Sequence, residues 1–139
     1  MTLFDKAKEY IGDGTIDLDG DTFKAAIVTS TGAVDVTDDV WADLSANIAA
    51  NVAAITLTSV TWVESSGTIT FDCDALVFTA SGGDGTGRHL VIYDDTVSSP
   101  IVDPLICFAL LDATPADYTI LSGNTLTLTP PAAGLFQVA

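Results

Sequence analysis

Short apolar segments, separated by turn residues, recur along the whole chain and predict β-strands. Residues 68–73 alternate between apolar and polar side chains, as in a strand with one buried face. The eight-residue apolar run at 104–111 is typical of a strand buried on both faces. The remaining strands are predicted at 15–18, 22–30, 55–63, 75–80, 88–93, 118–121, 125–129 and 135–138, with 33–37 as a further short candidate.

Turn signals about every 8–12 residues give about nine short strands, a pattern typical of sandwiches and barrels. We therefore predict an all-β fold, a β-sandwich of the Ig-like or jelly-roll-like kind, in one domain over residues 1–139. The N-terminal segment is predicted to be helical instead, because the apolar residues in 3–11 follow helical spacing and Thr2 can cap the helix. A short helix or arm is expected at 1–12, ended by Gly12 and Gly14.

Three local features refine this picture. The dipeptide Asp19-Gly20 lies between two strand-like runs and predicts a tight hairpin. The alternation in 55–63 slips by one residue near Ser59, which a β-bulge would explain. Residues 38–44 resemble one helical turn or an ordered loop, whereas the small apolar stretch at 47–54 predicts no single structure.

The charge of the chain is strongly negative and limits its partners. Among 139 residues there are 19 acidic and 4 basic ones, for a formal net charge of -15. Binding to a phosphate backbone or to an anionic membrane needs clustered lysine and arginine, so no nucleic acid and no membrane partner is expected. No apolar run approaches a membrane span, and no signal peptide is predicted, so we expect assembly in a cytoplasm.

The chain is also unusually apolar for its charge. Hydrophobic residues make up 48% of it. This excess favours a large core together with one apolar surface that a partner buries, although a large core alone stays open as the alternative. Plausible partners therefore carry positive charge or meet the chain through apolar surface.

The candidate catalytic residues lack the partner residues that a known type of catalytic site would need. His89 is the one histidine, and it lies within a predicted strand with no nucleophile elbow in the sequence. Cys73 and Cys107 lie in apolar runs, which favours two buried free thiols over a disulfide. One histidine and two separated cysteines do not supply zinc-ligand spacing. We expect neither enzymatic activity nor a cofactor.

Two loops invite ligand-binding interpretations. Asp17, Asp19 and Asp21 could meet a Ca²⁺ ion, but an EF-hand beginning there would need glycine and glutamate where Thr22 and Val28 stand. A turn with solvated carboxylates is favoured instead. The glycine-rich segment 81–87 lacks the Gly-Lys-Ser/Thr ending of a phosphate loop and precedes a strand. It is interpreted as a mobile hairpin loop that folds against a partner.

Several stretches together resemble a family of small structural proteins of tailed bacteriophages, encoded among head and tail genes. The resemblance covers nearly the whole chain, but its motifs are structural and none is catalytic. Where family members carry a glycine-rich segment, this chain has the shorter, alanine-rich 45–54. The stretches are Leu3-Phe4-Asp5, residues 15–28, 38–44, 55–62, 67–72 and 90–96, Pro104-Leu105-Ile106-Cys107 and Gly134-Leu135-Phe136.

The resemblance implies a virion component assembled in the bacterial host. The favoured role is a capsid decoration (cement) protein on the outer capsid surface, with the major capsid protein and copies of itself, expected as a homotrimer, as partners. A tail or neck protein remains an alternative, as does a receptor- or carbohydrate-binding module, which would need Trp41 and Trp62 exposed. Residues expected to contact partners are Leu3, Phe4, Tyr10, Gly82, Gly83, Asp84 and Arg88.

Overall fold

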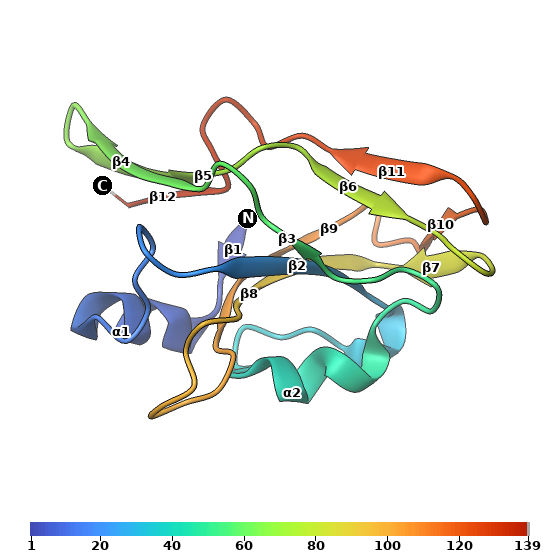
Figure 1. The fold of residues 1–139 in the computed structure, drawn as a ribbon, viewed down its shortest axis with the longest axis horizontal. Helices are drawn as coiled ribbons and strands as arrows, with labels where there is room; N and C mark the ends of the chain where they lie inside the picture. The colour runs from blue at the N-terminus through green and yellow to red at the C-terminus, as the bar shows by residue number, and fades with distance from the viewer. Residues whose placement is uncertain (139) are drawn as a thin grey trace.

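A five-stranded antiparallel sheet forms the middle layer of the molecule and is covered on both faces (Figure 1). The computed structural model describes residues 1–138. The order across the sheet is β1-β9-β8-β2-β3, so its strands pair across long stretches of sequence. The strands are β1 (Thr2–Leu3), β9 (Leu105–Leu110), β8 (His89–Asp94), β2 (Phe23–Val28) and β3 (Ile55–Thr56).

The residues of the central strands explain why this sheet lies between two layers. Alternate side chains of a strand point to opposite faces, and here both sets are apolar. Along β2, Phe23 and Ile27 belong to one buried cluster, whereas Ala26 and Val28 belong to the other. A β-bulge interrupts the pairing of β8 with β9, because Ile92 lies opposite Cys107 and Tyr93 opposite Leu105.

Three small antiparallel sheets form the layer on one face of the central sheet (Figure 1). Strand β5 is the centre of the largest, and the chain runs from it directly into β6 of the next. These strands are β4 (Thr61–Ser65), β5 (Thr68–Asp72) and β12 (Phe136–Val138); β6 (Leu76–Thr79) and β11 (Thr125–Leu128); and β7 (Gly85–Gly87) and β10 (Tyr118–Ile120).

Two α-helices and two 3-10 segments cover the other face. Helix α1 (Asp5–Asp13) ends at Gly14, whose φ of 79° is a left-handed conformation that glycine adopts readily. Gly12 lies inside this helix, and Thr2 pairs with Phe108 in the sheet instead of capping it. The other elements are η1 (Ser30–Gly32), α2 (Trp41–Leu44) and η2 (Ser45–Asn47).

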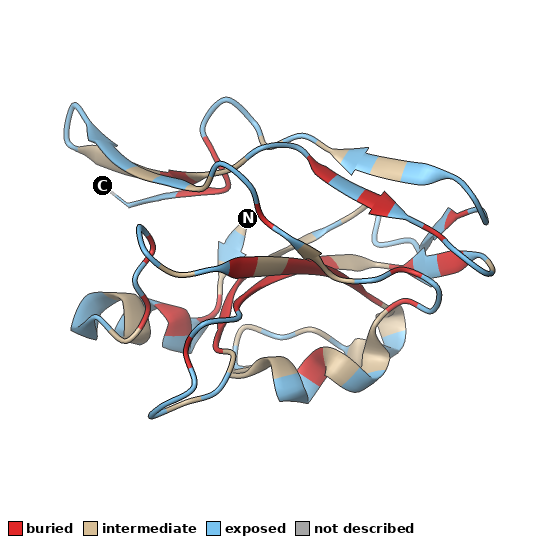
Figure 2. Ribbon diagram, viewed as in Figure 1, coloured by how far each residue is buried: buried red, intermediate tan, exposed pale blue. Residues whose placement is uncertain are grey.

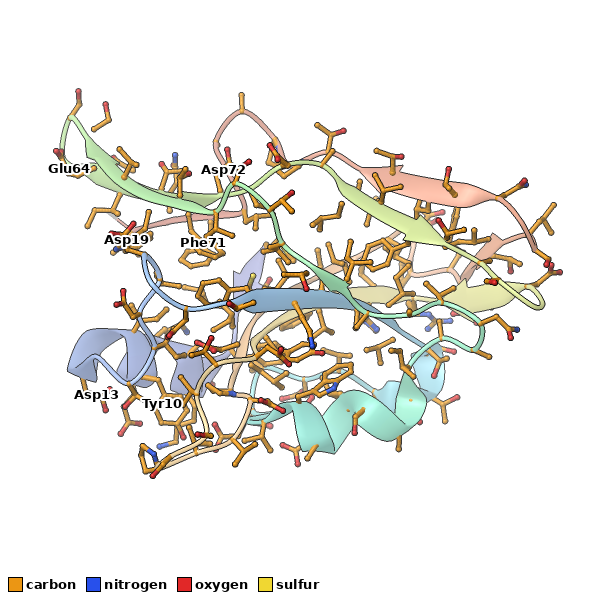
Figure 3. All side chains as sticks on the ribbon, viewed as in Figure 1. Tyr10, Asp13, Asp19, Glu64, Phe71 and Asp72 are labelled. Carbon is orange, nitrogen blue, oxygen red and sulfur yellow. The ribbon has the colours of Figure 1, made fainter. Side chains whose placement is uncertain are left out.

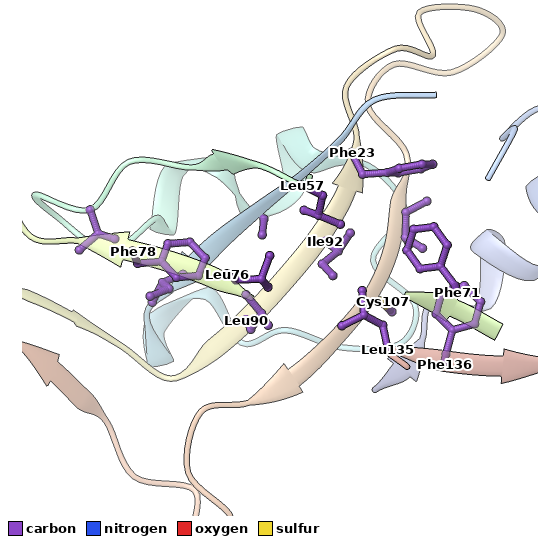
Figure 4. Close-up of a cluster of buried hydrophobic side chains, with 14 of the residues drawn as sticks. Phe23, Leu57, Phe71, Leu76, Phe78, Leu90, Ile92, Cys107, Leu135 and Phe136 are labelled. Carbon is purple, nitrogen blue, oxygen red and sulfur yellow. The ribbon is translucent and has the colours of Figure 1, made fainter. Parts of the chain in front are cut away.

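The larger core fills the space between the central sheet and the three small sheets (Figures 2 and 4). Phe71 is its aromatic centre: its ring centroid lies 5.0 Å from that of Phe136, 5.3 Å from Phe23 and 6.5 Å from Trp62. Such offset and edge-on pairs add to the free energy gained by burying the rings. A second cluster between the sheet and the helices includes Phe4, packed on Phe108.

The predicted fold class is confirmed: the chain is an all-β, sandwich-like fold with a short N-terminal helix. Three local predictions were wrong. Residues 15–18 form no strand, and Asp19-Gly20 is a turn and not a hairpin, because the N–H groups of Gly20 and Asp21 both donate to the Asp17 carbonyl and close a turn there. Residues 33–37 form no strand. The slip at Ser59 is not a bulge but a break with φ of 51°, where the chain leaves the central sheet at β3 and enters another at β4.

The two cysteines are unpaired in the structure, as predicted. Cys107 is buried in the larger core, and Cys73 is partly exposed beside it. Within residues 1–138 there is no helix long and apolar enough to span a membrane.

Candidate contact surfaces

Most of the 19 acidic residues gather around α1, in the turn 15–22 at the same end of the molecule, and in the loops on the helix side of the central sheet. We define this acidic face as α1, the turn 15–22, the segment 34–44 and the loop 94–104. Only Lys6, Lys8 and Lys24 add positive charge there. The acids are Asp5, Glu9, Asp13, Asp17, Asp19, Asp21, Asp35, Asp38, Asp39, Asp43, Asp95 and Asp103, and Asp94 lies buried beneath them.

Hydrogen bonds fix the segments of the acidic face against one another. The Tyr10 hydroxyl donates to Asp39 Oδ2 at 3.3 Å, joining α1 to the segment 34–44. The Trp41 N–H donates to the Asp103 carbonyl at 2.8 Å, which joins that segment to the loop 94–104. Much of the negative charge is therefore held on ordered backbone.

Local bonding also keeps some of these carboxylates ionised. Asp35 Oδ1 accepts hydrogen bonds from both the backbone N–H and the hydroxyl of Thr37, which lower the pKa of Asp35. Bonds from Thr15 lower the pKa of Asp13 in the same way. The short aspartate side chain makes these turn bonds easily, which explains the bias of the sequence toward aspartate.

The few basic side chains are already paired with acids of the same chain. Lys6 and Lys8 contact Glu9 and Asp5 along α1, at 2.7 and 3.1 Å. Lys24 lies 2.8 Å from Asp95, and Arg88 Nε lies 2.8 Å from Asp117 Oδ1. These pairs leave the acidic excess to be balanced from outside the chain.

Two of the three carboxylates of the predicted Ca²⁺ site accept hydrogen bonds within their own turn, where Asp19 is labelled in Figure 3. Asp17 Oδ1 accepts the Asp19 N–H at 3.1 Å, and Asp21 Oδ2 accepts the Asp17 N–H at 2.7 Å. Among the residues described, no three His, Cys, Asp or Glu side chains are grouped as a metal ion requires. These two bonds hold the acids in a turn.

The outward face of the small sheets is almost free of charge. Leu76, Phe78, Phe71 and Trp62 point inward, so the alternate positions point to solvent. Along β4, β5, β12, β6 and β11 only Asp72 carries charge among these outward positions. The other outward residues are Thr61, Val63, Ser65, Thr68, Thr70, Gln137, Val77, Thr79, Thr125 and Thr127.

An apolar groove opens between the two layers at the end of β9, and its volume is about 160 Å³. Leu90 and Leu110 contribute from the central sheet, and Leu76 and Leu128 from the small sheets. A neighbouring hollow of about 490 Å³ shares Met1, Pro131 and Leu135 with it.

The structure separates the predicted contact residues instead of grouping them. Leu3 lines the hollow beside the groove, and Tyr10 lies on the acidic face, but Phe4 is fully buried. Its side chain is part of the second core cluster and is not available to a partner, because β1 places it under the sheet. The segment 82–88 lies at the opposite end of the molecule from α1 (Figure 1).

The glycine-rich segment is held within the chain, in contrast to the mobile loop predicted. Asn51 Nδ2 donates to the Asp84 carbonyl at 2.9 Å, and the Ser122 N–H donates to Asp84 Oδ1 at 2.8 Å. Gly85 and Gly87 are buried in β7, which pairs with β10. Gly82, Gly83 and Arg88 remain at least partly accessible.

His89, Cys73 and Cys107 have no activating partner among the contacts of the described residues. The His89 ring lies edge-on to Phe108, with 6.4 Å between centroids, and burial lowers the pKa of His89. Burial raises the pKa of Cys73 to about 11 and that of Cys107 to about 12, so both thiols remain protonated at neutral pH. Neither thiol is activated as a nucleophile in this arrangement.

Both tryptophans make core contacts. Trp41 stacks on Tyr93 with 4.4 Å between ring centroids and an interplanar angle of 1°. Trp62 packs on Phe71 and Phe136. Neither side chain therefore provides the open aromatic platform that a carbohydrate-binding module would need.

Sequence reasoning did not locate the groove or the uncharged sheet face. The apolar excess of the sequence indicated a contact surface, but its position depends on which strands lie at an edge. Comparison with protein-family models, with curated proteins and with solved structures finds no match to this chain.

Proposed function

We propose that the chain is a non-enzymatic bacteriophage structural protein that decorates the outer surface of the major capsid protein shell and stabilises it. Copies of the chain, expected as a trimer, would bind together at equivalent positions. The observation that carries the proposal is the separation of charge between an acidic face and an uncharged sheet face. The family resemblance of the sequence supplies the virion context.

The acidic face suits a partner surface with basic patches. Its carboxylates are fixed by turn hydrogen bonds, and the basic residues of the chain are already paired. Complementary charge across an interface speeds encounter and selects orientation more than it adds affinity. A subunit charged on one side would therefore dock on a basic shell with that side inward.

Two alternatives remain as proposals of lower rank. A tail or neck protein would use the same charge separation against a different virion partner. A receptor- or carbohydrate-binding module loses its main support, since both tryptophans are engaged in core contacts. Tyr118 is 43% exposed, and a single aromatic side chain makes a poor sugar platform.

The test is binding of the purified chain to capsid shells that lack it, measured by co-sedimentation at low and high salt. We expect saturable, stoichiometric binding that weakens with salt, because screening shortens the range of charge interactions to about 8 Å at 0.15 M. Absence of binding to such shells would rule out the decoration role. Binding to isolated tails instead would favour the tail alternative.

A matched pair of triple variants assigns the binding face. Neutralising Asp13, Asp19 and Asp43 to asparagine removes three charges from the acidic face. At about 0.5 kcal/mol for each exposed charge pair, shell binding should weaken about tenfold. The control neutralises Asp72, Asp74 and Asp112, which lie off the acidic face, and should leave binding almost unchanged. Equal losses in both variants would contradict docking through the acidic face.

A further inference from the structure

The groove at the end of β9 combines an apolar lining with an open sheet edge. The residues that line it include Leu76, Leu90, Leu111 and Leu128 (Leu76 and Leu90 are labelled in Figure 4). At about 160 Å³ it is smaller than the roughly 300–1,000 Å³ of typical ligand pockets. Its volume is close to the roughly 150 Å³ of an apolar protein cavity that can bind one benzene molecule. The groove therefore has room for one or two apolar side chains.

Hydrogen-bonding directions show that β9 has a free edge at the groove. Bonding groups point alternately to the two sides of an antiparallel strand. The Phe4 N–H donates to the Ile106 carbonyl on the outer side, and the Leu111 N–H donates to the Arg88 carbonyl on the inner side. The N–H and C=O of Leu110 therefore point outward.

Nothing in the described chain covers this edge. Strand β1 pairs with β9 only at Cys107 and Phe108, so the described pairing stops short of Leu110. Within residues 1–138 no backbone hydrogen bond to the outward groups of Leu110 is found. The side chain of Leu110 is also 43% exposed.

The edge lacks the features that usually protect free edges from pairing. Natural sheets guard them with charged side chains, prolines or bulges. Pro130 and Pro131 guard the opposite wall, beyond the end of β11. At the groove, Ala109 and Leu110 of β9 and the following Leu111 carry no charge and no proline, and the bulge of β9 lies at its other end. An unguarded edge beside an apolar groove fits an added strand, with backbone bonds for affinity and a side chain in the groove.

Charge decides which partner fits this place. With a net charge of -15, two copies of the chain repel each other at most orientations. The residues that line the groove carry no charged side chain, and the adjoining hollow contains Lys8 and the Met1 ammonium group. Among the surfaces described, this region can meet an acidic partner without facing carboxylates, whereas a basic partner would favour the acidic face.

We propose that the groove and the free end of β9 bind an extended edge of a second copy of this chain. Leu110 is the central residue, because its backbone pairs with the incoming strand. Its side chain lies beside that strand on the helix side of the sheet, whereas Leu111 lines the groove that takes the inserted apolar residue. This assignment rests on the association between copies that the proposed function includes, and it names the surface that would carry it.

The test measures self-association by sedimentation equilibrium, with full-length wild type and two variants. Leu110→Asp places a carboxylate in the contact, and burying it unpaired should raise the dissociation constant about 30-fold or more. The matched control is Val63→Asp, because Val63 is 57% exposed on the uncharged sheet face and should not change the dissociation constant. Thermal unfolding of both variants checks that each is folded.

A second measurement needs no variant. Hydrogen exchange at the Leu110 amide should slow at least tenfold as wild-type concentration rises through the dissociation constant, while exposed amides elsewhere stay unchanged. If the wild type is still monomeric at a protein concentration of roughly 100 µM, any self-association is weak and the proposal is overturned. Shell binding by such a monomer would leave the decoration role standing. Association that persists in Leu110→Asp, or an unprotected Leu110 amide in the oligomer, shows that another surface joins the copies.

Discussion

A buried carboxyl group at the end of β8 gives the sharpest test of the energetics of the fold. The side chain of Asp94 is fully buried, with an exposure of 0%. Its Oδ1 accepts hydrogen bonds from the N–H groups of Thr96 at 2.7 Å and Val97 at 3.1 Å, whereas no partner is found for Oδ2 within residues 1–138. Burial raises the pKa of Asp94 to about 6, against the effect of the two backbone bonds, and the nearby Asp21 carboxyl raises it further.

The direction of the pH effect follows from this shift. A pKa raised on folding means that the folded state binds the proton more tightly than the unfolded state, so ionised Asp94 destabilises the fold. The rise from 3.8 to about 6, at 1.36 kcal/mol per pKa unit, corresponds to about 3 kcal/mol above pH 6. That destabilisation disappears as the pH falls from about 6 to about 4. A typical domain is stable by about 5–15 kcal/mol, so the effect is measurable.

The variant Asp94→Asn removes this charge and keeps the Oδ1 acceptor. Its amide can also donate toward Asp21, so at pH 8 we expect the free energy of unfolding to rise by up to about 3 kcal/mol. At pH 4 the variant and wild type should differ by less than about 1 kcal/mol, because Asp94 is then protonated in the folded state and about half protonated in the unfolded state. Urea unfolding followed by circular dichroism between pH 4 and 8 measures both values.

Relief of general repulsion among the acids must be separated from this local effect. Asp19→Asn serves as the control, because it removes an exposed charge from the same face. If Asp94→Asn gains no more stability at pH 8 than Asp19→Asn, the assignment of a buried ionised carboxylate is wrong. A gain that stays constant from pH 8 to pH 4 would refute the titration of Asp94 as its cause.

Two further predictions concern packing, and urea unfolding measures both. Phe71→Ala should lower the free energy of unfolding by about 3–5 kcal/mol, because it leaves a cavity at the aromatic centre of the larger core. Its control, Val77→Ala at an exposed position, should lower it by less than about 0.5 kcal/mol. Similar losses in the two variants would contradict the role of Phe71 as the centre of the core. Gly87→Ala should lower the free energy of unfolding by about 1–3 kcal/mol, because the new Cβ would collide with Ile27. Gly12→Ala in α1 adds a Cβ in open space and should raise the free energy of unfolding by about 0.5–1 kcal/mol. No loss of stability in Gly87→Ala would show that β7 can move away from Ile27.

The sequence alone determined most of the segments that become strands and where the first helix lies, although it missed β1 and β7. Period-two alternation marked β5, and the apolar runs marked β2, β8 and β9, because side-chain direction along a strand depends only on local geometry. The helical spacing of 3–11 located α1 to within two residues at each end. The interrupted alternation at Ser59 marked a real break in the strand. The break is the point at which the chain passes from the central sheet to a small sheet, and not a β-bulge.

The local sequence pattern could not identify which strands pair with one another. The Asp19-Gly20 signal predicted a hairpin with the preceding segment, but β2 pairs instead with β8, more than 60 residues later in the chain. The turn is held to the far loop, where the Thr22 N–H donates to Thr96 and the Asp95 N–H donates to Thr22. Such pairings depend on long-range packing that no short window of sequence contains.

Only the tertiary structure decided how the two surface properties of the chain are arranged. The sequence determined a strong negative charge and an apolar excess. The fold then collected the acids around α1 and its neighbouring loops, left the outward face of the small sheets uncharged, and left the end of β9 open beside a groove. These outcomes depend on which strand lies at an edge and which loops meet, because contacts distant in sequence fix both.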